Sequence, residues 1–323
     1  MPDMTYREAI RETLREAMRA DDRVFLMGED IGAYGGAYAV TKGLMDEFGE
    51  KRVKDSPIAE SVLVGAGIGA AMGGLRPVLE IMSINFSLLA ADQIVNNAAK
   101  LLYMSGGQVN VPLVIRTVSG AGNMLGASHS QSLENWYANV PGLKVVTPAT
   151  PHDARGLLRS SLRDPNPVIY VEHSLLYNIK GPVPDAEYFV PLGLADIKRP
   201  GKHVTIVSYL RMVHVALRAA EMLAAEGIEA EVVDLRSLRP LDIETVVQSV
   251  KKTNRAVVVE EGWKTGGIGA EVAASIMSAA FDYLDSPVER VAGKEVPMPY
   301  NRELEQAAIP SAQDVVTVAK TLF

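Results

Sequence analysis

The sequence contains no cysteine among its 323 residues. This absence excludes disulfides, thiolate nucleophiles and cysteine-ligated metal centres, although it does not identify a compartment. The longest apolar stretch, Ser61 to Leu75, is shorter than the roughly 20 residues that a membrane-spanning helix requires. The chain also shows no basic region followed by an apolar run at its start. We therefore predict a cytoplasmic protein that makes no membrane contact.

A basic stripe is also missing. The formal net charge is −7, and the lysines and arginines are scattered along the chain, so we expect no nucleic-acid partner. Hydrophobic residues make up 48% of the sequence and charged residues 22%, which is typical of a globular protein. The length is sufficient for two domains, each with its own core.

Helical and strand patterns alternate along both halves of the chain. Apolar residues recur every four positions after Thr5, a candidate helix cap, at Tyr6, Ile10, Leu14 and Met18. A long helix is predicted over about 88–104. Between the helices lie continuous runs of Val, Ile and Leu, which indicate parallel sheets covered on both faces. We predict an α/β fold with two doubly wound domains.

The alternation of helices and strands stops once, in a region rich in proline and charge. We predict a first domain over 1–185, a linker over 186–200 and a second, smaller α/β domain over 201–323.

Two residues are candidates for acid–base chemistry. Pro57 keeps the residue before it extended, so Glu60 should lie at the start of the apolar helix, where α/β folds place ligands. The alternative is that Glu60 only complements the helix dipole. His129 lies in a loop among small polar residues, where it could transfer a proton or remain an ordinary surface histidine. No Gly-x-Ser-x-Gly elbow is present, which argues against a hydrolase.

Three further motifs allow more than one interpretation. Phe86 follows a strand and could stack on a flat ring or pack in the core. The turn at 163–167, with Asp164 and Asn166, could hold a cation or be only a turn. The glycines at 266–269 resemble a dinucleotide loop, but they lack the full spacing and more simply permit close packing of a helix.

The order of several segments is distinctive over essentially the whole chain. These segments are Gly28-Glu29-Asp30-Ile31, Asp55-Ser56-Pro57-Ile58-Ala59-Glu60, Asn85-Phe86-Ser87, Asp92-Gln93-Ile94-Val95-Asn96, Tyr103-Met104-Ser105-Gly106-Gly107, His129-Ser130-Gln131, Pro141-Gly142-Leu143-Lys144-Val145-Val146, Asp234-Leu235-Arg236-Ser237-Leu238-Arg239-Pro240 and Val296-Pro297-Met298-Pro299-Tyr300. Together they resemble segments of the β subunits of thiamine-diphosphate-dependent 2-oxo acid dehydrogenases.

The resemblance implies a pyrimidine-binding domain followed by a transketolase C-terminal-like domain. It implies that the chain is an enzyme subunit, active only with an α subunit in an α2β2 heterotetramer. Thiamine diphosphate would span the interface of α and β, and an E2 dihydrolipoyl acyltransferase would receive the acyl group. A non-catalytic scaffold of the same fold is the alternative from another class, and Glu60 and His129 argue against it.

Residue by residue, the resemblance assigns Glu60 to N1′ of the aminopyrimidine and Phe86 to packing on that ring. Ile58 and Met82 would line the same pocket, with Glu29 as a nearby acid. His129 would orient the intermediate and assist acyl transfer to the lipoyl arm.

The resemblance also implies two metal ions. A structural potassium ion would be bound by Leu113, Ser161, Leu162, Asp164 and Asn166. The Gly-Asp-Gly motif that binds Mg²⁺ and the diphosphate in thiamine enzymes is absent from this sequence, so Mg²⁺ is expected on the α subunit.

The substrate implied by the resemblance is a small 2-oxo acid. The segments Asn85-Phe86-Ser87 and Pro297-Met298-Pro299-Tyr300 are more similar to pyruvate enzymes than to branched-chain ones. The segment 119–128 departs from the common pattern before the histidine, which leaves acetoin and branched-chain 2-oxo acid enzymes as alternatives.

Overall fold

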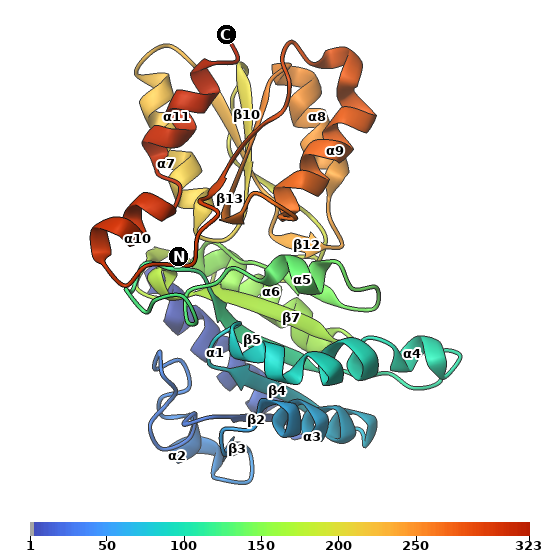
Figure 1. Cartoon of the computed structure of the whole chain (residues 1–323). Coiled ribbons are helices and arrows are strands. Elements are labelled where there is room, and N and C mark those ends of the chain that lie inside the picture. Colours follow the sequence, from blue (N-terminus) through green and yellow to red (C-terminus); the bar gives the residue numbers. More distant parts are fainter. Residues whose placement is uncertain (1–2) are drawn as a thin grey trace. The chain divides into compact units, whose positions relative to one another are not determined.

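The computed structural model describes residues 3–323, which form two compact α/β units (Figure 1). The first unit contains Met1–Ser119 and Trp136–Leu192, and the second contains Gly120–Asn135 and Gly193–Phe323. The loop with His129 therefore belongs to the second unit, although it lies within the first half of the sequence. No periodic pattern in the sequence indicates that residues 120–135 belong to the second unit.

The first unit is built on a parallel sheet with the strand order β6-β7-β5-β4-β2-β3. Its strands are β2 (Val24–Gly28), β3 (Val53–Asp55), β4 (Arg76–Ile81), β5 (Val114–Ser119), β6 (Lys144–Val146) and β7 (Val168–His173). A short antiparallel pair, β1 (Asp3–Thr5) with β8 (Lys180–Pro182), lies apart from this sheet. The continuous apolar strands are buried, as expected for a parallel sheet with helices on its faces.

The helices of the first unit are α1 (Tyr6–Ala20), α2 (Leu44–Phe48), α3 (Glu60–Met72), α4 (Leu101–Met104) and α6 (Pro151–Arg163), and α5 (Glu134–Ala138) spans the boundary of the two units. A capping box between Thr5 and Glu8 starts α1, which packs against α6, and the predicted apolar face of α1 is buried. The prediction for α1 is therefore confirmed.

The predicted long helix over 88–104 is wrong in detail. The segment consists of a 3-10 turn over Phe86–Ala90, a π-helical segment over Gln93–Ala98 and the short α4. Gly65 on α3 faces the side chain of Gln93 in this segment. Irregular helices of this kind are frequent at functional sites, and the apolar period cannot distinguish them from a regular helix.

The second unit has a five-stranded sheet with the order β14-β13-β10-β11-β9, which is parallel except at its β9 edge. The strands are β9 (Asp196–Arg199), β10 (Val204–Ser208), β11 (Ala230–Asp234), β13 (Ala256–Trp263) and β14 (Glu289–Gly293), with β12 (Ser237–Arg239) outside this sheet. In Figure 1, α7 (Met212–Ala224) and α11 (Ala312–Lys320) pack together, as do α8 (Ile243–Thr253) and α9 (Ile268–Ala280). α10 (Arg302–Ala308) precedes α11.

The stretch 186–200, predicted as a linker, contains the boundary between the two units and ends in a strand. Val190 donates its backbone N–H to the Gly156 carbonyl (3.2 Å) and accepts a hydrogen bond from the Ser160 hydroxyl (2.6 Å), which fixes it to the first unit. From Asp196 the chain forms β9, which pairs with β11 in the second unit. The prolines and charges of this stretch mask the strand pattern.

Candidate active site

The carboxyl ends of β2, β3 and β4 lie at one edge of the first sheet. Gly28, the last residue of β2, is in register with both Asp55 and Glu80 on the neighbouring strands. Glu29 and Met82, which directly follow β2 and β4, therefore lie at the same edge. This edge is where open α/β sheets place their ligands.

Glu60 is the first residue of α3, and only 4% of its surface is exposed. Ala59, the capping residue, has no side chain that could bind the free amides of the first turn. The helix dipole favours a negative charge at this point. Among residues 3–323, however, no side chain donates a hydrogen bond to the Glu60 carboxylate. The Glu60 oxygens are also not among the fully buried side-chain atoms that lack a partner, so an external donor can reach this carboxylate.

Glu29 lies close enough to Glu60 for the two carboxyl groups to interact. Burial raises the pKa of Glu29, and the carboxylates of Glu60 and Asp30 raise it further. Two neighbouring acids, of which one takes up a proton more readily, are suited to proton transfer.

Met82 and Phe86 are half-buried beside the same strand end. The turn that carries Phe86 is fixed by Ser87, whose hydroxyl bonds to the Ile84 carbonyl (2.6 Å) and the Tyr137 hydroxyl (2.5 Å). Ile58 differs from them, because 81% of its surface is exposed. The predicted pocket is thus open at Ile58 within this chain.

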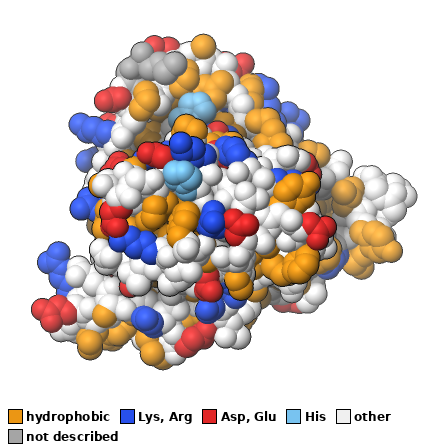
Figure 2. Space-filling view, turned by 90° about the horizontal axis from the view of Figure 1, so that it is seen from above, with side chains coloured by type: hydrophobic (Ala, Val, Ile, Leu, Met, Phe, Trp, Pro, Cys, Tyr) orange, Lys and Arg blue, Asp and Glu red, His pale blue; other side chains and the backbone are white. Residues whose placement is uncertain are grey.

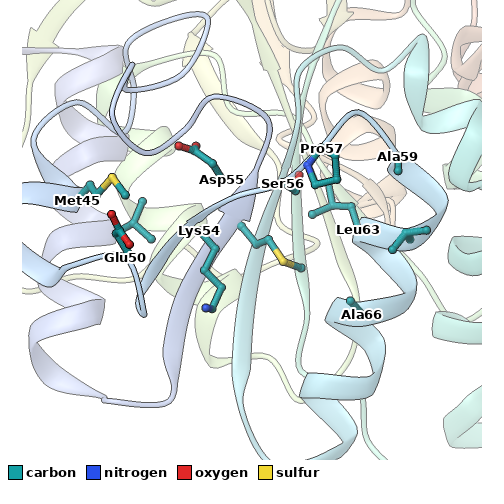
Figure 3. A pocket seen from close by; sticks show the side chains of 12 residues that line it. Met45, Glu50, Lys54, Asp55, Ser56, Pro57, Ala59, Leu63 and Ala66 are labelled. Atoms are coloured by element: carbon teal, nitrogen blue, oxygen red, sulfur yellow. The ribbon is translucent and has the colours of Figure 1, made fainter.

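A pocket of about 500 Å³ lies between β3 and α3, next to the segment that leads to Glu60. In Figure 3, Leu63 and Ala66 on α3 face this space across from Lys54 on β3. Asp55 lines the same pocket and accepts a hydrogen bond from the Gly32 backbone (2.6 Å). No sequence pattern predicts this pocket, since its lining comes from elements with no common motif.

A buried ion cluster crosses the centre of the first sheet. Arg116 on β5 donates to Glu80 on β4 (2.6 Å) and to Glu172 on β7 (2.9 Å), and the Tyr177 hydroxyl also donates to Glu172 (2.8 Å). Burial raises the pKa of Glu172. Although burial opposes the charge of Arg116, the carboxylates of Glu172 and Glu80 raise the pKa of the guanidinium overall. The sequence does indicate this cluster, because Glu80, Arg116 and Glu172 each lie inside a largely apolar strand.

His129 lies exposed in the second unit, whereas Glu60 lies in the first. Its Nδ1 forms a hydrogen bond with the Ser128 hydroxyl (2.9 Å), and its backbone N–H donates to the Gly126 carbonyl (3.3 Å). The separate roles predicted for His129 and Glu60 remain predictions.

The predicted potassium ligands lie around the end of α6. The Asp164 carboxylate is paired with Lys144 (2.6 Å), and the Leu162 carbonyl accepts a hydrogen bond from Arg76 (2.5 Å). The side-chain oxygen of Asn166 is buried and has no hydrogen-bond partner. Asn166 therefore fits a cation, but two of the five predicted ligands already contact a cationic side chain.

The glycine-rich loop before α9 binds an internal carboxylate. Glu260 accepts hydrogen bonds from the Gly269 backbone N–H (2.9 Å) and from Arg290 (2.6 Å). A Cβ atom at Gly267 would lie 2.5 Å from the Glu260 carboxylate. The helix start that would bind a diphosphate is thus filled, which argues against a nicotinamide site.

Three wider features of residues 3–323 bear on function. No group of three or more His, Cys, Asp or Glu side chains there is placed to hold a metal ion. No helix in this range is long and apolar enough to cross a membrane. On the face drawn in Figure 2, basic and acidic side chains are interspersed.

Comparisons with known proteins cover nearly the whole chain. Residues 2–180 match the transketolase pyrimidine binding domain, and residues 193–315 match the transketolase C-terminal domain. A solved structure titled "Split gene transketolase, inactive beta4 tetramer" is similar with a TM-score of 0.80 at 26% identity, over 99% of this chain and 98% of that one. The predicted α/β fold class is confirmed.

Relatives from plants and bacteria are similar over almost the full length of this chain. The chain is 52% identical over 322 residues to pyruvate dehydrogenase E1 component subunit beta-1, mitochondrial, from Oryza sativa subsp. japonica (98% of this chain, 86% of the relative). It is 51% identical over 323 residues to pyruvate dehydrogenase E1 component subunit beta from Rhizobium meliloti, a match that covers 100% of this chain and 70% of the relative. The subunit beta from Rickettsia felis is 49% identical over 317 residues (98% and 97%). This chain therefore belongs to the family of pyruvate dehydrogenase E1 component β subunits, as the order of its sequence motifs predicted.

Proposed function

We propose that this chain supplies the β half of a pyruvate dehydrogenase E1 component. With an α subunit, in an α2β2 heterotetramer, it decarboxylates pyruvate and transfers the acetyl group to the lipoyl arm of an E2 acyltransferase, with reduction of the lipoyl disulfide. Relatives named for this enzyme at 49–52% identity support the substrate. The single observation that carries the chemistry is the buried Glu60 carboxylate, which has no donor within residues 3–323.

The residues at the sheet edge fit thiamine diphosphate. The buried carboxylate of Glu60 is suited to an aminopyrimidine nitrogen, and the half-buried Phe86 and Met82 are suited to the faces of its ring. When bound, thiamine diphosphate supplies the carbanion and the electron sink for decarboxylation. Glu60 exchanges a proton with N1′, and Glu29 beside it takes up a proton more readily than an ordinary glutamate because burial raises its pKa. Ile58 closes the pocket once the α subunit covers its exposed side chain.

His129 acts after decarboxylation in this proposal. Its imidazole orients the substrate and assists transfer of the acyl group to the lipoyl arm. The hydrogen bond between the Ser128 hydroxyl and Nδ1 supports this role, because it orients the ring on an exposed loop that a partner domain can reach.

The metal assignments are part of the proposal. The α subunit binds Mg²⁺ and the diphosphate. Potassium binds near Asn166, whose side-chain oxygen is buried without a partner. For the ion to reach Asp164, Lys144 must rotate away from the carboxylate that it now contacts.

The variant Glu60→Ala, assembled with the α subunit, tests the role of this carboxylate. We expect the decarboxylation rate with an artificial electron acceptor to fall by about 10²–10⁴-fold, the usual contribution of a general acid–base group. The heterotetramer should still form, as measured by analytical ultracentrifugation. Glu271→Ala is the matched control, because Glu271 is an exposed acid in the first turn of α9. If both variants retained normal turnover, Glu60 would be only a helix-dipole residue.

The substrate is tested on the same assembled enzyme. We expect kcat/KM to be highest with pyruvate when it is compared with 2-oxoisovalerate and acetoin. Activity confined to the branched acid or to acetoin would overturn the substrate while leaving the role of Glu60 intact.

A further inference from the structure

The loop before His129 is bound by a buried carboxylate from a distant helix. Glu305 on α10, with 1% of its surface exposed, accepts hydrogen bonds from the backbone N–H groups of Gly122 (3.0 Å) and Met124 (3.0 and 3.1 Å). Buried carboxylates usually pair with cationic side chains. Here the donors include two main-chain amides of one loop, so Glu305 fixes the path of the backbone.

The base of the same loop is fixed by further bonds within the second unit. Glu261 on β13 accepts a hydrogen bond from the backbone N–H of Ala121 (2.7 Å). The Gly120 N–H donates to the Gln131 carbonyl (3.1 Å), which closes the loop on itself.

The backbone between these anchors has an unfavourable conformation. Gly122 has a φ of +112°, which glycine adopts without strain, but Met124 has a φ of +57°, in the region that residues other than glycine avoid. Such a conformation persists only where the surroundings hold it. Glu305 binds these two residues.

Tyr300 contacts the loop at a second point. A Cβ atom at Gly126 would lie 2.3 Å from Cζ of Tyr300, so the ring lies directly on this glycine. The carbonyl of Gly126 accepts the backbone N–H of His129. Tyr300, the last residue of the segment 297–300 that is similar to pyruvate enzymes, thus contacts the histidine loop.

We propose that Glu305 is a positioning residue for His129. It holds the preceding backbone in its left-handed path, so that the imidazole stands in place before the lipoyl arm arrives. This inference rests on the proposed role of His129 in acyl transfer. A group that is already oriented reacts faster, and small displacements of such groups cost large factors in rate.

Hydrogen exchange measured by mass spectrometry on the assembled heterotetramer tests the structural half of this proposal. In Glu305→Ala, we expect the peptide at 120–131 to exchange about tenfold faster, because its amides lose their acceptor. Glu305→Gln should lie between this variant and the parent, since its amide oxygen can replace the Oε1 that accepts both 3.0 Å bonds. Glu303→Ala, an exposed acid on the same helix, is the control. Unchanged exchange in Glu305→Ala would overturn the proposal.

Half-reactions test the functional half. We expect Glu305→Ala to lower lipoyl acetylation about tenfold while decarboxylation with an artificial acceptor changes less than about twofold. If Glu305 acts through His129, the double variant His129→Ala/Glu305→Ala should transfer no more slowly than His129→Ala alone. Glu305→Gln gives the same comparison if the alanine variant does not fold.

The outcomes separate this inference from the proposed function. If His129→Ala transfers normally, the role of His129 is wrong, and the positioning proposal ends with it. If His129→Ala is impaired but the losses of the two single variants multiply, Glu305 acts independently of the histidine and only the positioning proposal is overturned. Equal losses of both half-reactions in Glu305→Ala would also overturn it.

Discussion

At the scale of single residues, the proposed site combines two acids in different environments. Glu60 is buried at a helix start, whereas Glu29 is half-buried in the segment after β2. Burial raises the pKa of Glu29, and the negative charges of Glu60 and Asp30 raise it further. A negative charge on Glu29 therefore carries an energetic cost at this edge of the sheet.

This cost predicts a pH-dependent effect of Glu29→Gln. Burial, with Glu60 and Asp30, raises the pKa of Glu29 in the folded chain above its ordinary value of 4.5. The folded chain therefore binds this proton more tightly than the unfolded chain, and the parent loses stability as pH rises above 4.5. At pH 7 we expect Glu29→Gln to have a Tm higher by about 1–2 °C, because solvent screens a half-buried group.

Thermal unfolding from pH 4 to pH 8 checks this prediction. The difference between Glu29→Gln and the parent should vanish toward pH 4. Glu50→Gln, which replaces an exposed acid nearby, should show no comparable trend. A difference that is constant with pH would exclude the proton as its cause.

Local patterns predict some of the site residues and not others. Pro57 and the apolar helix after it are enough to place Glu60 at a helix start. Glu305 could not be found in this way, because its partners Gly122 and Met124 precede it by 183 and 181 residues. Only the folded second unit brings them together.

At the scale of elements, α3 shows why packing can override helix propensity. Glycine in a helix costs about 1 kcal/mol relative to alanine, yet α3 contains Gly65, Gly67 and Gly69. A Cβ atom at Gly67 would lie 2.6 Å from Cδ1 of Leu79 on β4. Leu79 is completely buried and has little space to move. Gly67 therefore allows α3 to lie against the sheet and sets the position of Glu60 at its start.

Gly67→Ala and Gly69→Ala should consequently have opposite effects on stability. We expect Gly67→Ala to destabilise the chain by about 1–3 kcal/mol through overpacking. No atom lies within 4 Å of a Cβ at Gly69, so Gly69→Ala should stabilise it by about 0.5–1 kcal/mol through helix propensity. Urea unfolding of the two variants measures both values. Equal destabilisation by the two variants would show that close packing of α3 against β4 is not the reason for glycine at position 67.

Elements with one apolar face were predicted more accurately than irregular ones. In α1 the fourfold spacing and the Thr5 cap were sufficient, because the capping box and buried face are local features. The segment 86–104 has apolar residues at similar spacing, but its backbone changes from 3-10 to π to α form. This choice depends on contacts with α3, which sequence spacing does not contain.

At the scale of the whole molecule, the first unit leaves apolar side chains uncovered around its site. Ile58 and Val62, at the start of α3, have 81% and 69% of their surfaces exposed. Isolated exposed apolar residues are ordinary, but these two flank the buried Glu60 and line or border the pocket beside it. Under the proposed function, the α subunit covers them and completes the cofactor site.

Ile58→Asp should therefore impair assembly without impairing folding. An exposed side chain contributes little to the stability of the free β chain, so its Tm should change by less than about 2 °C. A carboxylate buried without a partner in an interface costs several kcal/mol, which corresponds to weaker α binding on the order of a hundredfold. Sedimentation of α and β mixtures measures this affinity, with Met277→Asp on the outer face of α9 as the control. Normal assembly of Ile58→Asp would show that the α subunit does not bury Ile58. The α subunit would then not be the part that covers the site around Glu60.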